Sequence, residues 1–172
     1  MVCMDAIHSN ISNTSFTLDQ VHHQVEVWRS VVEAAIFQET KKPLAQRYHT
    51  AVAQLSAADR RLVEQWDETQ WLEQITPETF TTYVERLRAW ADSVPTLVVY
   101  VPVELPELEI GMLAAEVRAQ LSGQHVLDMR IDPNVTGGCA FIHQEQYYDY
   151  SLHGRLMQQP KVLSEIFNAY VE

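Results

Sequence analysis

The chain has 172 residues and a formal net charge of −11, with 13 acidic against 8 basic residues before Pro95 and 10 against 4 from Pro95 onward. Because both halves are acidic, neither a nucleic acid nor an anionic membrane surface is expected as a partner. The two cysteines, Cys3 and Cys139, exclude a framework of several disulfides and favour a reducing compartment. No uninterrupted apolar run reaches the length of a membrane span, so direct membrane insertion is not expected.

The first 16 residues, MVCMDAIHSNISNTSF, contain no Lys or Arg and no long apolar core. They therefore fit neither a secretory signal nor a basic transit peptide. We expect a flexible N-terminal tail over residues 1–16, because the first residues of a domain are commonly poorly ordered.

Four helices are predicted between residues 17 and 94, which gives an all-helical bundle. The first begins at Thr17-Leu-Asp-Gln20, which has the Ser/Thr-x-x-Glu/Gln pattern of a capping box. Its apolar residues then recur every three or four positions, as on one face of a helix. The other helices are predicted from Pro43 to Leu55, from Ser56 onward, and from Thr76-Pro77 to Trp90.

The periodicity changes at Pro95, where a small α/β domain over residues 95–172 is predicted. The run TLVVYVPV, residues 96–103, is typical of a buried strand. A helix over 106–123 begins with Pro and has Gly at its end. Three more strands (125–132, 139–143 and 146–150) precede a closing helix that contains Leu163, Ile166, Phe167 and Tyr170. The predicted class is α+β: a helical bundle over 17–94, then strand, helix, strand, hairpin and helix.

The stretch DPNVTGGCAFIHQEQYYDYSLHGRL, residues 132–156, contains the candidates for a chemical site. Loops that hold phosphate place glycines before a helix, commonly with a Lys, whereas Gly137-Gly138 precedes a predicted strand and has no nearby Lys. A tight corner that needs positive φ is therefore favoured. Asp149 and Ser151 can be an acid and hydroxyl pair or a helix N-cap, and capping is the favoured interpretation.

Cysteine and histidine residues show no catalytic or metal-binding spacing. Cys139 and His143 share a strand face but lie roughly 13 Å apart along it, so we expect Cys139 to be a small buried residue. The seven His residues lack the spacing of zinc motifs. We predict no catalytic residue, no metal and no cofactor. Three of the four Trp residues lie on apolar stripes and are expected in the core, and Trp71 is the Trp most expected at an interface.

Residues 96–158 resemble the C-terminal domain of the F-type ATP synthase delta subunit, called OSCP in mitochondria. The resemblance consists of an alternating strand that ends in Asp-Pro, a Gly-Gly, a short hairpin, and Asp-x-Ser before a helix with a basic residue and Leu. The residues that match this structural motif are Asp132, Pro133, Gly137, Gly138, Asp149, Ser151, Gly154, Arg155 and Leu156. The helical half diverges, because four helices are predicted where the family usually has six.

The resemblance implies a non-catalytic subunit of the peripheral stalk, part of the stator in proton-driven ATP synthesis. Its partners would be the N-terminal segments of the head alpha subunits and the stalk b subunit. It would lie in the cytoplasm, peripheral on the inner face of the cell membrane as part of the synthase complex. The candidate partner-interface residues are Leu18, Val21, Val25, Trp28, Trp71, Ile166, Phe167 and Tyr170.

Two alternatives remain open at this point. One is another rotary-ATPase stalk or scaffold protein, similar to the V/A-type E subunit, which a long N-terminal helix continuing past Lys41 would favour. The other is a small enzyme with a site near Asp149, Ser151 and His153, which would require a pocket with converging polar groups.

Overall fold

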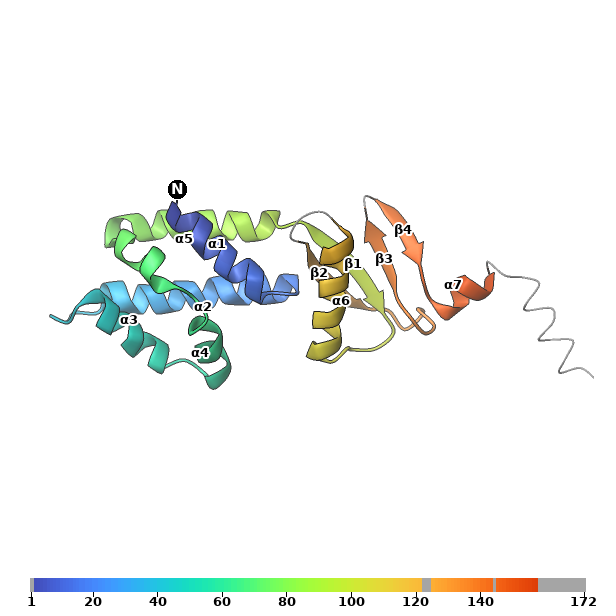
Figure 1. Cartoon of the computed structure of the whole chain (residues 1–172), viewed down its shortest axis with the longest axis horizontal. Helices are drawn as coiled ribbons and strands as arrows, with labels where there is room; N and C mark the ends of the chain where they lie inside the picture. Colours follow the sequence, from blue (N-terminus) through green and yellow to red (C-terminus); the bar gives the residue numbers. More distant parts are fainter. Residues whose placement is uncertain (1, 122–124, 144, 158–172) are drawn as a thin grey trace, which may run out of the picture. The chain divides into compact units, whose positions relative to one another are not determined.

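The computed structural model describes residues 2–121, 125–143 and 145–157. The chain divides into two compact units, residues 1–94 and 95–172, at the position where the sequence periodicity changes (Figure 1). The first unit is helical, and the second contains a four-stranded mixed sheet, which confirms the α+β class. No helix in these described ranges has both the length and the apolar character needed to cross a membrane. The predicted closing helix lies outside the described residues.

The helical unit contains five α-helices and two short 3-10 helices within residues 2–93. These are α1 (Val2–Thr14), α2 (Leu18–Phe37), α3 (Leu44–Ala53), α4 (Ala57–Val63), η1 (Glu68–Gln70), η2 (Leu72–Gln74) and α5 (Pro77–Ser93).

The starts of α2, α4 and α5 follow their predicted capping signals. The amide of Gln20 donates to Thr17 Oγ1 over 3.2 Å, and the Gln20 side chain accepts from the Thr17 amide, so the capping box is complete. Ser56 accepts from the Asp59 amide at the start of α4. Pro77 occupies the first turn of α5, where its missing N–H removes no helical hydrogen bond.

The prediction of a flexible tail over residues 1–16 is wrong, because residues 2–14 form α1. Ile7 and Ile11, one helical turn apart, are 1% and 0% exposed, and α1 packs against α2 and α5. Thr14 Oγ1 donates to Gln24 Oε1 over 2.8 Å, which links the end of α1 to α2. The segment has weak local helix signals, and burial of its apolar face in the bundle stabilises it instead.

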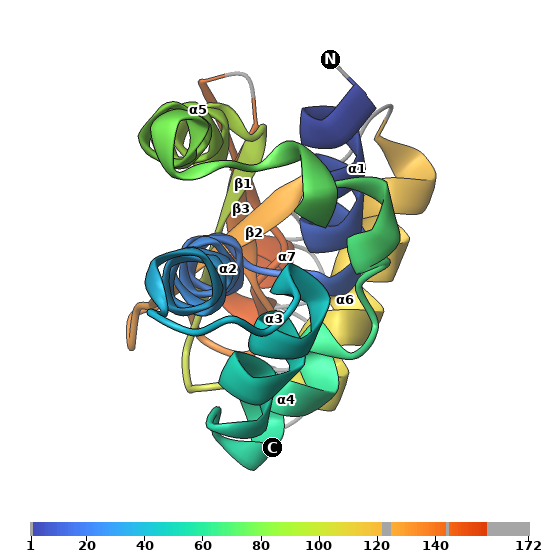
Figure 2. The same ribbon diagram turned by 90° about the vertical axis from the view of Figure 1, so that its left-hand side faces the viewer.

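The two long helices α2 and α5 pack against each other, and Figure 2 views both nearly end-on. Aromatic side chains fill the core around them. The Trp28 ring lies 5.9 Å from Trp71 and 6.5 Å from Phe80, and Tyr48 contacts Trp71 edge-on. Such ring pairs stabilise a core beyond the area that they bury.

The second unit is built on a sheet with strand order β2-β1-β3-β4. β1 (Thr96–Val101) pairs in parallel with β2 (Val126–Ile131) and antiparallel with β3 (Ala140–His143), which pairs antiparallel with β4 (Gln146–Asp149). The connection from β1 to β2 is α6 (Glu107–Gln120), which lies in front of these two strands in Figure 1. Parallel strands require such a crossover.

The strand register decides which side chains share the face that α6 covers. Leu97 and Val99 of β1 point to this face and are buried, and Phe141 of β3 pairs with Val99. Tyr148 of β4 pairs with Phe141 and therefore lies on the same face. Beyond the sheet, the short helix α7 (Leu152–Met157) follows β4.

Candidate functional site

The stretch 132–155 folds into one hydrogen-bonded corner that joins the end of β2 to the start of α7. Asp132 Oδ1 accepts from the Asn134 amide over 2.9 Å and closes a turn directly after β2. The Leu152 amide then donates to the carbonyl oxygens of Thr136 and Gly137, over 2.9 and 2.7 Å. These bonds tie the loop before β3 to the first residue of α7. We call this set of contacts the corner.

Two glycines of the corner permit close approach of the backbone. Gly138 has φ 92°, and a Cβ there would lie 2.6 Å from the carbonyl oxygen of Tyr150. A Cβ on Gly154 would lie 2.5 Å from the carboxyl carbon of Asp149. Gly137 also has positive φ, 62°. The predicted tight corner with positive φ is confirmed, and the phosphate-loop alternative has no helix directly after the glycines.

Asp149 and Ser151 form the cap of α7. The Gly154 amide donates to Ser151 Oγ over 3.0 Å, and the Ser151 amide donates to Asp149 Oδ1 over 2.8 Å. Hydrogen bonding to the Ser151 side chain, and then to the Ser151 amide, lowers the pKa of Asp149. The predicted capping role is confirmed. Asp149 also lines a surface hollow of about 390 Å³ with Arg155 and three tyrosines, but its side chain is oriented by the cap.

Cys139 and His143 line a groove between α6 and the β3–β4 hairpin, which we call the α6 groove. Its volume is about 260 Å³, and its lining residues are Leu97, Val99, Leu113, Glu116, Val117, Gln120, Leu121, Cys139, Phe141, His143, Tyr148 and Tyr150. Burial raises the pKa of the Cys139 thiol, against the opposing effect of Arg155. The thiol is therefore protonated at neutral pH, which does not suit a nucleophile. Cys139 is half-buried, less than predicted.

Three histidines of the helical unit, His22, His23 and His49, each lie near one carboxylate instead of clustering. His23 Nε2 lies 2.7 Å from Asp59 Oδ1, and His22 Nε2 lies 3.5 Å from Asp92 Oδ1. Within the described ranges, no three His, Cys, Asp or Glu side chains converge as metal ligands would.

A second groove lies between α2 and α5, and we call it the α2–α5 groove. Its volume is about 240 Å³, and its lining residues are His22, Val25, Glu26, Arg88, Ala91 and Asp92. Val25 and Ala91 are buried, whereas the side chains of His22 and Asp92 are 48% and 75% exposed. The α2–α5 groove therefore has an apolar floor and a charged, accessible rim.

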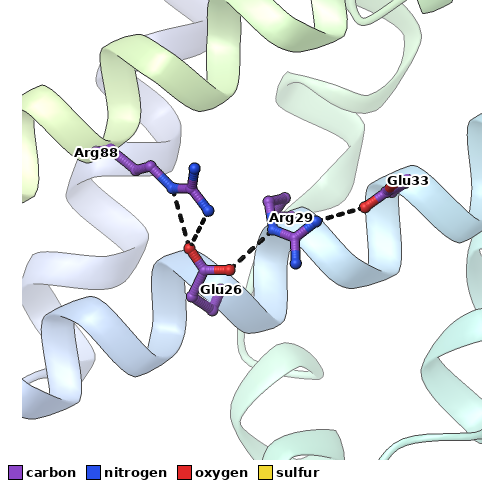
Figure 3. A network of polar contacts seen from close by, with 4 residues as sticks. All are labelled: Glu26, Arg29, Glu33 and Arg88. Carbon is purple, nitrogen blue, oxygen red and sulfur yellow. Dashed lines mark hydrogen bonds and ion pairs between the residues drawn. The ribbon is translucent and has the colours of Figure 1, made fainter.

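The polar network in Figure 3 fixes one side of the α2–α5 groove. Arg88 of α5 donates to Glu26 Oε1 of α2 over 2.6 and 3.0 Å, and Arg29 donates to Glu26 Oε2 and to Glu33. Hydrogen bonds from Arg29, and then from Arg88, hold the pKa of Glu26 below its usual range. The network joins two helices at the surface, where such pairs contribute about 0–1 kcal/mol each.

The predicted partner-interface residues of the helical unit are mostly core. Val21, Trp28 and Trp71 are at most 1% exposed, so their side chains belong to the core and the prediction that they contact a partner is wrong. Val25 is 2% exposed but lies on the floor of the α2–α5 groove, so its predicted contact stays a prediction. The apolar stripe of α2 faces α5 and the aromatic core instead. Leu18 is half-buried, and Ile166, Phe167 and Tyr170 lie outside the described residues.

Sequence reasoning missed both grooves. An amphipathic pattern identifies the buried stripe of a helix, but a groove is formed by the edges of two elements that pack together. The alternation of Phe141 with His143, and of Tyr148 with Tyr150, does place these aromatic residues on one sheet face. That alternation is the only sequence signal for the α6 groove.

No protein-family model matches the sequence, and no curated protein gives a match.

Proposed function

We propose that this protein is a non-catalytic linking subunit of the peripheral-stalk type, which joins a catalytic head to a stalk in an F-type ATP synthase. The observation that carries the proposal is the corner. Asp132, Gly137, Gly138, Asp149, Ser151 and Gly154, which match the family motif, act together to fix the backbone between β2 and α7. A motif that maintains a shape is what a structural link between two assemblies requires.

The division into two compact units also supports a linking role. Each unit has its own groove, and the two grooves differ in character, since one has a charged rim on helices and the other is aromatic and lies on a sheet. In the proposed function, the helical unit contacts the N-terminal segments of the head alpha subunits. The α2–α5 groove is the surface that we assign to this contact, because it combines an apolar floor with a charged rim.

The C-terminal unit would contact the stalk b subunit, and the complex would lie on the inner face of the cell membrane. The alternative of a V/A-type E-subunit-like protein has less support, because it requires a helix that continues past Lys41, whereas α2 ends at Phe37. The alternative of a small enzyme also has less support, because Asp149 and Ser151 cap α7.

Co-purification of the tagged full-length chain from its own cells tests the proposal. We expect the head alpha and stalk b subunits to be recovered with it. Asp92→Lys, at the rim of the α2–α5 groove, should reduce recovery of the head. Glu85→Lys, an exposed charge reversal on α5 outside the groove, should leave it unchanged. Recovery of a folded chain without head or stalk subunits would contradict the proposal.

A further inference from the structure

The α6 groove is open to solvent although its surface is mostly apolar. Its floor is Leu97 and Val99 of β1, and one wall is the α6 residues Leu113, Val117 and Leu121. α6 lies over β1 and β2 (Figure 1). Among the described residues, no helix covers the same face of β3 and β4, and the groove lies at this step beside α6. A sheet face of this kind is stabilised when another element packs on it.

The second wall is a row of aromatic rings on the hairpin. The Phe141 ring stacks on Tyr148, with centroids 5.1 Å apart, and on Tyr150, with centroids 5.5 Å apart and planes within 7°. Tyr150 remains 49% exposed. Because the stacked rings hold one another in place, binding of a partner to this wall costs little side-chain conformational entropy. Exposed aromatic clusters of this type are common at protein interfaces.

The apolar surface continues from the groove along the outside of α6. Leu108 and Met112 precede Glu116 at intervals of four residues, and they are 77% and 68% exposed. Residues at this spacing lie on one face of a helix. The apolar surface is therefore elongated along α6, which suits a rod-like partner better than a compact ligand.

One carboxylate at the groove and the acidic surface of the unit around it bear on the charge of a partner. Glu116 lies at the rim, and Gln120 Nε2 donates to its Oε1. Among the described residues of this unit, eight side chains are acidic and three are basic. Two of the three basic residues already have acceptors, since Arg130 pairs with Asp128 and Arg118 donates to the carbonyl oxygen of His125. The third, Arg155, lies near Cys139 at the hairpin side of the groove, whereas Glu116 lies on the α6 side. Electrostatic complementarity therefore favours a cationic partner.

We propose that the α6 groove binds an amphipathic helix that places its apolar face against Val117 and the Phe141–Tyr148–Tyr150 row and its basic face beside Glu116. This inference deepens the proposed linking function, on which it rests, by giving the surface and the chemistry of the stalk-side partner. Helix-in-groove recognition requires an apolar trough with anchors spaced by three and four residues. Side chains from α6 and from the hairpin supply the two sides of that trough.

The test uses the full chain with Cys3→Ser, so that Cys139 is the remaining thiol in the groove. The probe is an 18-residue peptide of Leu and Lys, with Leu at helical three- and four-residue spacing. We expect it to slow alkylation of Cys139 and to bind with an affinity that Glu116→Lys weakens by about fivefold, the equivalent of roughly 1 kcal/mol. Glu104→Lys makes the same charge change at an exposed position outside the groove and should change the affinity by less than about twofold.

The following results would overturn the proposal. Equal binding of a Leu–Glu peptide, or equal weakening by Glu104→Lys, would show that the groove does not select a basic helix. Protection of Cys139 without peptide, relieved by deletion of residues 158–172, would assign the groove to the chain's own C-terminal segment. Protection that rises with protein concentration together with a dimeric mass would assign it to a second copy. If the peptide fails but stalk subunits still co-purify, the linking function stands and only this surface is wrong.

Discussion

The His8 ring of α1 lies flat on the Trp90 ring of α5, with ring centroids 4.4 Å apart and planes within 11°. His8 Nε2 is buried and has no hydrogen-bond partner among the described residues. Burial lowers the pKa of His8, against the opposing charge of Asp5. The contact therefore attaches α1 to α5 through a neutral imidazole and makes this attachment sensitive to pH.

Replacement of His8 by Phe should reduce the loss of stability in mild acid. The folded-state pKa of His8 is below its ordinary value of 6.5. The unfolded chain therefore binds a proton first as the pH falls below 6.5, and folding stability falls with it. Phe keeps an aromatic ring against Trp90 but does not titrate. Urea unfolding at pH 7.5 and 5.5 measures the effect, and an identical pH dependence in both proteins would contradict it.

Ile11→Asp should destabilise the helical unit by about 3 kcal/mol or more, because it buries a carboxylate at a position that is 0% exposed. Asn13→Asp, two residues later on the exposed side of α1, is the control and should change stability by less than about 0.5 kcal/mol. Equal stability of both variants in chemical denaturation would restore the interpretation of residues 1–16 as a tail.

Trp71→Ala should cost about 3–5 kcal/mol of folding stability, the range for removal of a buried aromatic side chain. Trp71 is 1% exposed and contacts both Trp28 and Tyr48. Leu18→Ala, at a half-buried position, should cost about 1 kcal/mol. Thermal or urea unfolding would distinguish these losses. A Trp71→Ala variant that keeps native stability but binds a partner less tightly would contradict the core assignment and support the predicted interface role of Trp71.

The two adjacent glycines should differ in their tolerance of Ala. Gly137→Ala meets Leu152 Cβ at 3.6 Å, an ordinary contact, so only positive φ opposes it and the cost should be about 1–2 kcal/mol. Gly138→Ala adds a 2.6 Å approach to the Tyr150 carbonyl oxygen and should cost more, about 3 kcal/mol. Chemical denaturation of the two variants tests the order, and equal losses would contradict the described corner.

Ser151→Ala should destabilise α7 by about 1 kcal/mol, because the Gly154 amide loses its acceptor. Faster amide exchange at Gly154 would report the local loss. Ser93→Ala removes an exposed hydroxyl at the end of α5 and serves as the control, with a change within about 0.5 kcal/mol. Unchanged exchange at Gly154 would mean that Ser151 does not cap the helix.

Local signals in the sequence were sufficient for most of the elements and for the corner. The start at Thr17 is predicted from Gln20 three residues later and the start at Thr76 from the Pro that follows it, and the structure places helix starts after Thr17, Ser56 and Thr76. The capping role of Asp149 and Ser151 also depends on residues close to them in the chain. The requirement for glycine at the corner likewise follows from the local backbone conformation. Interactions within a few residues are determined by the sequence itself, since no distant element is needed to form them.

The sequence by itself therefore determined the boundary at Pro95, the capping box at Thr17, the strands and the Gly-Gly corner. Only the tertiary structure decided that residues 2–14 form a helix, that Trp71 belongs to the core, and that the α2–α5 and α6 grooves exist. Each of these depends on surfaces brought together from distant parts of the chain, as when Ile11 packs into the bundle or Val117 faces Phe141 across a groove. The free energy of such burial depends on what the fold places opposite a side chain, which periodicity within one segment does not specify.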